Sequence, residues 1–196
     1  MGNFEPLSLE TADAEGRDIL EQVQGNYGFI PNLLGNMAHA PVTAKGYLAL
    51  GQLVGETSFD PTEQQVILLA VSRYNECEYC VGAHSAISAM QKLPADVIES
   101  IRNDEPIADS KLEALRVFTT QVVDQRGWLS PEDIGNFIAA GYSQPQILEV
   151  VLGVAMKTIS NYTNHIAGTE LDAAFADFAW RTPRSNGQSF DIIAES

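Results

Sequence analysis

Two cysteines and a histidine lie close together in this chain of 196 residues, and their spacing could support redox chemistry. Cys77 and Cys80, the only cysteines, form a C-x-x-C motif, and His84 follows four residues after the second cysteine. On a helix, residues three and four apart share a face, so the three side chains would be neighbours. A thiolate with a second thiol one turn away is the minimum set of groups for reversible oxidation. The first sulfur attacks an oxidant or a disulfide, and the second resolves the product as an intramolecular disulfide.

The expected surroundings of the motif also favour a reactive thiol. Cys77 lies in the first turn of a predicted helix, where unpaired N–H groups and the helix dipole stabilise an anion. In such a place a thiol pKa of ~8.5 falls to roughly 3.5–7.5. His84 could accept the proton of Cys80 or stabilise its thiolate. We therefore predict that Cys80 has the lower pKa of the two cysteines.

Three other interpretations of the motif remain open. A zinc ion could take Cys77, Cys80 and His84 as ligands, but the sequence has no second C-x-x-C, and His39 and His165 are distant in sequence. A thioredoxin-like site needs a βαβ pattern, whereas the flanking sequence is helical in period. The cysteines could also be small buried residues of a core helix. We expect no metal site, and the absence of a Gly-rich phosphate loop predicts no bound organic cofactor.

The elements that would position the motif are helices, so the sequence predicts an all-α fold. Asp60-Pro61-Thr62-Glu63 is a helix start signal, and the apolar run from Val66 to Val71 after it predicts a central core helix from Gln65 to Tyr74. The helix with the motif should run from Cys77, capped by Asn75 or Glu76, to about Gln91. Further helices are predicted at 14–24 (ended by Gly25), 32–37, from Pro41 to at least Val54, 94–102, from Ser110 to Gly127, from Ser130 to near Gly141, 147–166 and 171–180.

A faint internal repeat suggests two related helical halves. Gln146 lies 81 residues after Gln65, and the same offset places an apolar run on 147–152 and His165 opposite His84. We expect His165 to be a satisfied polar residue where the halves meet. His39 is expected to be a surface residue of a loop, although it could line an access channel. Trp128 and Trp180 are expected to be packing anchors at helix ends.

Composition limits the classes of partner. The chain has 11 Lys and Arg against 26 Asp and Glu, a formal charge of −15, which disfavours nucleic acids and anionic membranes. The sequence contains no run of 18 apolar residues, so no transmembrane helix is predicted. The N-terminus lacks the features of a signal peptide, and a cytoplasmic location is therefore expected. The length suits a single domain over residues 1–196, with an N-terminal extension of about residues 1–40 and a tail of about residues 181–196.

Residues 65–84 resemble the carboxymuconolactone decarboxylase/AhpD-like superfamily in its thiol-bearing, alkylhydroperoxidase-like and peroxidase-related branch. The resemblance rests on the C-x-x-C-x-x-x-H motif after a capped apolar helix and extends to Gly28-Phe29-Ile30-Pro31-Asn32 and Ala40-Pro41. It implies an all-helical protein that assembles as a homo-oligomer (dimer, trimer or hexamer) and reduces peroxides or disulfides, an antioxidant activity that draws on an external thiol donor. By position Cys80 matches the attacking, peroxidatic cysteine, Cys77 the resolving cysteine, and His84 the relay histidine.

The chain departs from the family pattern at two candidate site residues. Gln65 stands where the peroxidase has a glutamate that helps to activate the thiol, and glutamine cannot accept a proton. Tyr79 stands where the well-known peroxidase has a histidine, and a phenol with a pKa near ~10 is a poor base at neutral pH. Both departures leave the redox pair intact.

The function predicted from the residues and the resemblance together is a thiol-dependent oxidoreductase. It would reduce alkyl hydroperoxides or small disulfides through Cys80 and Cys77, with electrons from an external thiol. One alternative is a non-catalytic redox-sensing or binding protein whose thiols only change state. Another is a lactone decarboxylase-like enzyme, a weaker interpretation because that branch of the family generally lacks the C-x-x-C motif.

Overall fold

Helices form every regular element of the computed structural model, which describes residues 4–182. The predicted all-α fold is confirmed, since these residues contain no strand. The elements are α1 (Ala14–Tyr27), α2 (Asn32–Met37), α3 (Pro41–Gly55), α4 (Pro61–Tyr74), α5 (Glu78–Met90), α6 (Ala95–Asn103), α7 (Ser110–Asp124), α8 (Pro131–Ala139), α9 (Gln144–Ala167) and the short 3-10 helix η1 (Ala173–Phe178). Most of the tail assigned to residues 181–196 lies outside the described residues.

The helix start signals behave as the sequence predicts. At the start of α4 the Asp60 side chain accepts from the Glu63 N–H, the Glu63 side chain accepts from the Asp60 N–H, and Pro61 occupies the first helical position. Ser130 and Asp133 form the same reciprocal pair at the start of α8. These bonds satisfy N–H groups that lack partners within the helix, and they fix where each helix begins.

The ends of helices were predicted less well. Gly28, not Gly25, ends α1, because its φ of 79° allows the left-handed turn that closes the helix. The helix predicted at 171–180 is instead the shorter 3-10 helix η1. Trp180 follows η1 and is an anchor as expected, since its indole N–H donates to the carbonyl of Arg102 over 3.0 Å. Trp128 is 87% exposed, so its predicted packing role was wrong.

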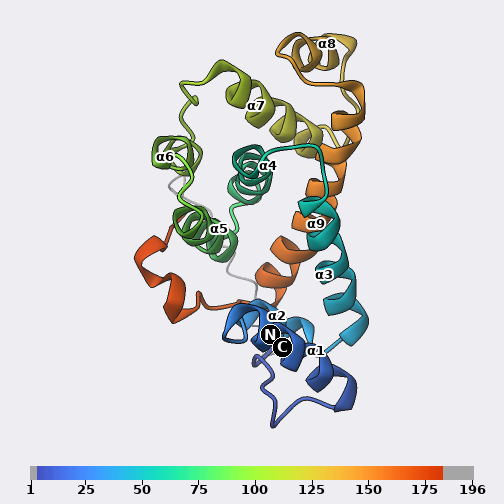
Figure 1. Cartoon of the computed structure of the whole chain (residues 1–196), viewed down its shortest axis with the longest axis vertical. Coiled ribbons are helices and arrows are strands. Elements are labelled where there is room, and N and C mark those ends of the chain that lie inside the picture. The colour runs from blue at the N-terminus through green and yellow to red at the C-terminus, as the bar shows by residue number, and fades with distance from the viewer. Residues whose placement is uncertain (1–3, 183–196) are drawn as a thin grey trace, which may run out of the picture.

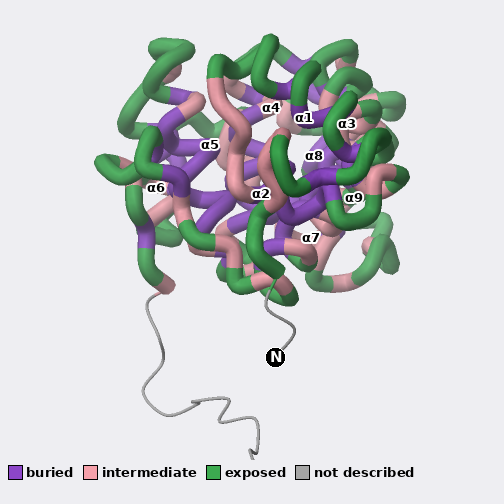
Figure 2. Tube along the Cα trace, turned by 90° about the horizontal axis from the view of Figure 1, so that it is seen from below, coloured by how far each residue is buried: buried purple, intermediate pink, exposed green. Residues whose placement is uncertain are grey.

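Helix α4, which carries the apolar run from Val66 to Val71, lies at the centre of the molecule and packs against α5, α6, α7 and α9. Figure 1 shows α4 and α5 nearly end-on, with α3 and α9 running together down one side, α1 and α2 at one end, and α7 and α8 at the other. The chain segments in the interior are mostly buried, and those on the outside are mostly exposed (Figure 2). The helix with the C-x-x-C motif, α5, packs against α4, α6 and η1, and its N-terminal end reaches the long α9.

A glycine allows α9 to lie close against α4. A Cβ atom built on Gly153 would lie 2.6 Å from Cγ2 of Ile67, far inside ordinary contact distance. Lys157 follows Gly153 by one helical turn and is completely buried. The close approach at Gly153 thus brings α9 near enough for its next turn to reach the side chains of α4 and α5.

The faint internal repeat does not correspond to two similar halves. Residues 65–71 and His84 lie on two separate helices, α4 and α5, whereas residues 147–152 and His165 lie on the single helix α9. His165 is exposed rather than buried at a junction. The shared apolar run reflects two helices that both face the core, which is a common pattern in any helical protein.

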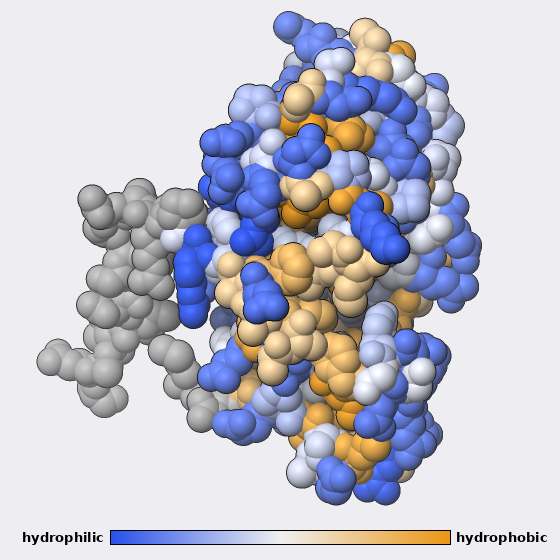
Figure 3. Space-filling model, turned by 60° about the vertical axis from the view of Figure 1, so that its left-hand side comes forward, coloured by the Kyte–Doolittle hydropathy of each residue, from blue (hydrophilic) through white to orange (hydrophobic). Residues whose placement is uncertain are grey.

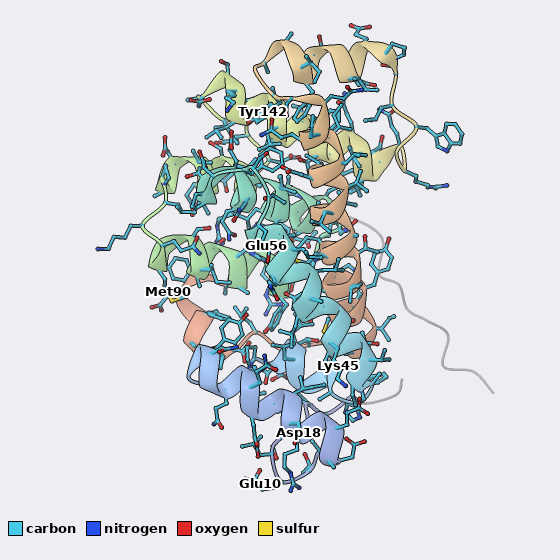
Figure 4. All side chains as sticks on the ribbon, turned by 45° about the vertical axis from the view of Figure 1, so that its right-hand side comes forward. Glu10, Asp18, Lys45, Glu56, Met90 and Tyr142 are labelled. Carbon is cyan, nitrogen blue, oxygen red and sulfur yellow. The ribbon has the colours of Figure 1, made fainter. Side chains whose placement is uncertain are left out.

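The surface carries scattered charges and some apolar area. Asp18 on α1 and Lys45 on α3 lie at one end of the molecule, whereas Tyr142 lies towards the other, and Met90 projects outwards at the end of α5 (Figure 4). Apolar side chains gather in the middle of the face shown in Figure 3, between charged margins. No helix within residues 4–182 combines the length and the apolar character that a membrane span requires.

Candidate redox site

The two cysteines lie where the chain turns from α4 into α5. Asn75 follows the last residue of α4, and Glu76 has a φ of 53°, which turns the backbone sharply. Cys77 is then the N-cap of α5, one position before the first-turn place predicted for it, and Cys80 lies in the first turn. Neither Asn75 nor Glu76 caps α5, because the left-handed residue between the helices delays its start.

Both sulfur atoms are buried and face α9. Cys77 and Cys80 are each 1% exposed, and both are free thiols. The side-chain amide of Asn164 donates to Cys80 Sγ over 3.2 Å and to Cys77 Sγ over 3.7 Å. Ser160 Oγ lies 3.8 Å from Cys80 Sγ. The pair therefore has hydrogen-bonding groups of α9 on one side and an apolar cluster around the rest, which shields it from bulk water.

A polar face of α9 supplies these groups, and the sequence analysis did not identify it. Lys157, Ser160, Asn161 and Asn164 follow the i, i+3, i+4, i+7 spacing of one helix face, and all four are buried. The amide of Asn75 donates to Asn161 Oδ1 over 2.9 Å, which fixes this face against the turn before Cys77. The spacing is visible in the sequence, but Thr158, Thr163 and His165 on the same helix are also polar, so the spacing alone did not mark this face as buried.

His84 joins the helices through both of its ring nitrogens. Nδ1 lies 2.9 Å from Gln65 Oε1, and Nε2 lies 3.0 Å from Lys157 Nζ. The amide oxygen can only accept and the ammonium can only donate, so Nδ1 carries the hydrogen and Nε2 accepts from Lys157. Two of the candidate site residues, Gln65 and His84, are thus in direct contact. Burial, with the nearby Lys157 charge, also holds the pKa of His84 well below its usual value.

The cysteines have opposite pKa shifts. Burial by itself would raise the pKa of Cys80, but the hydrogen bond from the Cys77 thiol and the positive charge of Lys157 bring it well below the ordinary value. Ser160 and Asn161 lower it further. The hydrogen bond to Cys80, together with burial, raises the pKa of Cys77. This order agrees with the prediction, but the cation responsible is Lys157 rather than His84, which is neutral here.

Tyr79 points away from the thiols, contrary to its predicted place in the site. Its hydroxyl donates to Asp172 Oδ2 over 2.6 Å, and the other oxygen of that carboxylate accepts the N–H of Asn32 over 2.9 Å. Burial and the bond to Asp172 raise the pKa of Tyr79 further above the neutral range. The phenol therefore ties α5 to α2 and to the segment before η1, and it is not directed at either sulfur.

We expect Tyr79→Phe to weaken the fold without removing the thiol chemistry. The variant loses a buried hydrogen bond to a carboxylate, an interaction that contributes about 1.5–3 kcal/mol. Denaturant unfolding should show a loss of that size, while the reduced protein still forms the Cys77–Cys80 disulfide. An unchanged free energy of unfolding with a lost disulfide would instead assign the phenol to the chemistry.

The remaining candidates lie outside this cluster. His39 is exposed, as expected, and its Nε2 lies 2.8 Å from the carbonyl oxygen of Glu5. Across the residues that the structure describes, no group of three or more His, Cys, Asp or Glu side chains is arranged to hold a metal ion. The partners of His84 are an amide and an ammonium, and an ammonium repels a metal cation.

Comparison with known proteins supports the family resemblance. Residues 41–120 match the model of the carboxymuconolactone decarboxylase family. No curated protein gives a significant sequence match.

Solved structures with the same fold cover most of the chain. An uncharacterised peroxidase-related protein from Ralstonia eutropha JMP134, described as an alkylhydroperoxidase AhpD core, is 21% identical, with 89% of this chain and 96% of that chain covered and a TM-score of 0.75. A peroxidase-related protein from Silicibacter sp. TM1040 is 18% identical with the same coverage and a TM-score of 0.73. A variant of the debrominase Bmp8 bound to 2,3,4-tribromopyrrole is 17% identical over 89% of this chain and 94% of that chain, with a TM-score of 0.73. This chain therefore has the all-α AhpD-like fold, and its residues 41–120 match the carboxymuconolactone decarboxylase family.

Proposed function

We propose that this protein is a thiol-dependent oxidoreductase that reduces alkyl hydroperoxides or small disulfides. The observation that carries the proposal is the setting of Cys80. Its buried sulfur accepts a hydrogen bond from the Asn164 amide, and the Cys77 thiol and the positive charge of Lys157 lower its pKa. A thiolate in such a place is a nucleophile with its resolving thiol already beside it.

The proposed reaction with a hydroperoxide takes three steps. The Cys80 thiolate attacks the terminal peroxide oxygen, the O–O bond breaks, and the products are a sulfenic acid on Cys80 and an alcohol after one proton is added. The Cys77 thiol then displaces water from the sulfenic acid, forming the Cys77–Cys80 disulfide. Two external thiols reduce this disulfide and leave as their own disulfide. A small disulfide as substrate would oxidise the pair by thiol–disulfide exchange instead, with two thiols as products.

The test is turnover with defined reagents. Reduced protein is mixed with tert-butyl hydroperoxide and excess dithiothreitol, and peroxide consumption is followed over many equivalents per chain, with a small disulfide in a parallel assay. Sustained consumption that requires the protein supports the proposal. Formation of one disulfide per chain without turnover of either substrate would favour the redox-sensing alternative. Failure of the two thiols to oxidise would contradict both the proposed function and that alternative.

The debrominase of similar fold suggests one further arm for the same assay. Its substrate-like ligand, 2,3,4-tribromopyrrole, is added in place of the peroxide. Debromination that exceeds peroxide and disulfide turnover would replace the proposed substrate class. We also predict an external thiol donor, a homo-oligomer and a cytoplasmic location. Sedimentation of the purified protein would determine the oligomeric state.

A further inference from the structure

Lys157 is a buried cation whose counter-ion is not a carboxylate. The residue is 0% exposed, and no Asp or Glu oxygen of the described residues lies within 4.0 Å of its Nζ. Its hydrogen-bond partner is the neutral ring of His84. A buried charge is strongly disfavoured unless an opposite charge compensates it. The nearby group that can supply the negative charge is the thiolate of Cys80.

We propose that Lys157 stores the proton of this redox site: it is an ammonium that balances the Cys80 thiolate in the reduced protein, and an uncharged amine once Cys80 is oxidised. The proposal rests on the proposed function, because it requires the Cys77–Cys80 disulfide to form. Within residues 4–182, formation of the disulfide removes the one negative charge that can balance Lys157. The remaining neighbours, His84, Ser160 and Asn161, are neutral, so the ammonium would be left uncompensated.

The proton balance of each step follows from this exchange. When the Cys80 thiolate attacks a hydroperoxide, Lys157 donates a proton to the departing alkoxide, which leaves a sulfenic acid, an amine and an alcohol. Displacement of water by Cys77 changes no net charge. An external thiol then attacks Cys77, its proton passes to the amine of Lys157, and Cys80 leaves as a thiolate beside the renewed ammonium. A second external thiol releases Cys77 as a thiol, so the buried site is electrically neutral after every step.

The glutamine at position 65 is consistent with this arrangement. Gln65 fixes the His84 ring so that Nε2 presents its lone pair to Lys157, and it adds no charge. A carboxylate at this position would provide a second, permanent counter-ion beside His84 and Lys157. The thiolate of Cys80 would then be less necessary, and its pKa would rise. Gln65 thus acts as a positioning residue that leaves Cys80 as the only anion of the site.

Few other groups of the site can take part in this titration. On α5, burial and the Lys157 charge keep His84 neutral, and the Cys77 pKa is raised. Tyr47 on α3 packs against the apolar cluster that contains both cysteines, and burial raises its pKa. Tyr79 and Asp172 are hydrogen-bonded to each other away from the thiols. Near neutral pH the protonation changes on oxidation therefore fall on Cys77, Cys80 and Lys157.

The test combines the ultraviolet absorbance of the thiolate with the pH dependence of the disulfide equilibrium. Reduced protein should show one thiolate per chain at neutral pH. The equilibrium constant for reduction of the disulfide should change hundredfold per pH unit, because two protons accompany two electrons. This change corresponds to a shift of ~59 mV in the reduction potential. If the thiolate is present but the equilibrium constant changes only tenfold per pH unit (~30 mV in the reduction potential), Lys157 keeps its proton on oxidation and the proposal is overturned. Absence of the thiolate would overturn it too.

Three variants separate the role of Lys157 from a merely structural one. Lys157→Met should lose the thiolate absorbance. Lys157→Arg should keep it, but its equilibrium constant should change only tenfold per pH unit, since guanidinium does not lose its proton. Gln65→Glu should lower the thiolate fraction at neutral pH. If the disulfide forms but the pH dependence of its equilibrium constant is the same in Lys157→Arg as in the wild type, Lys157 does not store the proton, while the proposed function stands. If no disulfide forms in the wild type, the proposed function itself fails.

Discussion

Cys80→Ser is expected to abolish both peroxide-dependent oxidation and thiol-dependent turnover. The hydroxyl that replaces the thiol cannot be ionised by Lys157 at neutral pH and cannot form a disulfide. Because Cys77 has a raised pKa and loses its resolving partner in this variant, it provides no substitute nucleophile. Peroxide consumption with dithiothreitol should fall to the rate without protein, while the far-ultraviolet circular dichroism of the helices is unchanged.

Cys77→Ser is the matched control for this result. It leaves the nucleophile and its neighbours on α9 in place but removes the resolving thiol. One equivalent of hydroperoxide should therefore oxidise Cys80 to a sulfenic acid or, with an external thiol, to a mixed disulfide, which mass spectrometry of the intact chain can detect. If Cys80→Ser retained activity and Cys77→Ser did not, the roles of the two cysteines would be reversed.

Lys157→Met should slow the reaction of Cys80 with an uncharged alkylating reagent by roughly 30-fold at pH 7. Without the ammonium, a thiol with an ordinary pKa of ~8.5 is only a few per cent ionised at that pH, whereas the pKa of Cys80 in the wild type is held well below its ordinary value. The rate for the variant should recover as the pH rises, because the thiol then ionises without help. The rate for the wild type should stay nearly constant over the same range.

A surface lysine provides the control for the charge change itself. Lys45→Met removes one positive charge from α3 at an exposed site, where Lys45 pairs with Glu15 (Figure 4). Exposed ion pairs contribute little, so neither stability nor thiol reactivity should change appreciably. An equal loss of reactivity in the Lys45 and Lys157 variants would show that net charge matters rather than the buried contact.

The fold and the centre of the site could be predicted because their signals are local. Capping residues, prolines at first helical positions and the apolar run of α4 each act within a few residues. The spacing of Cys77, Cys80 and His84 places them on one helix by the same short-range logic. The positions of helix ends depend on small preferences for left-handed backbone, which is why Gly25 and Gly28 were confused.

The groups that tune the site could not be placed in the same way, because they come from α9. Nothing near the C-x-x-C motif shows which helix will lie across it or in which rotational setting. The spacing of the polar residues from Lys157 to Asn164 is visible in the sequence, but their burial and their partners are not. Likewise, the sequence places Tyr79 beside Cys80 but does not show that Asp172, far along the chain, will take its hydroxyl.

The distance along the chain between the thiols and Lys157 also has a consequence for the newly made protein. Lys157 is synthesised 77 residues after Cys80, a delay of roughly 4–15 s at ~5–20 residues per second. During that interval Cys77 and Cys80 are present without the ammonium and amides of α9, so both behave as ordinary, slowly reacting thiols. Redox reactivity begins only when α9 docks against α4 and α5, which makes the rate of thiol alkylation a direct measure of the last stage of folding.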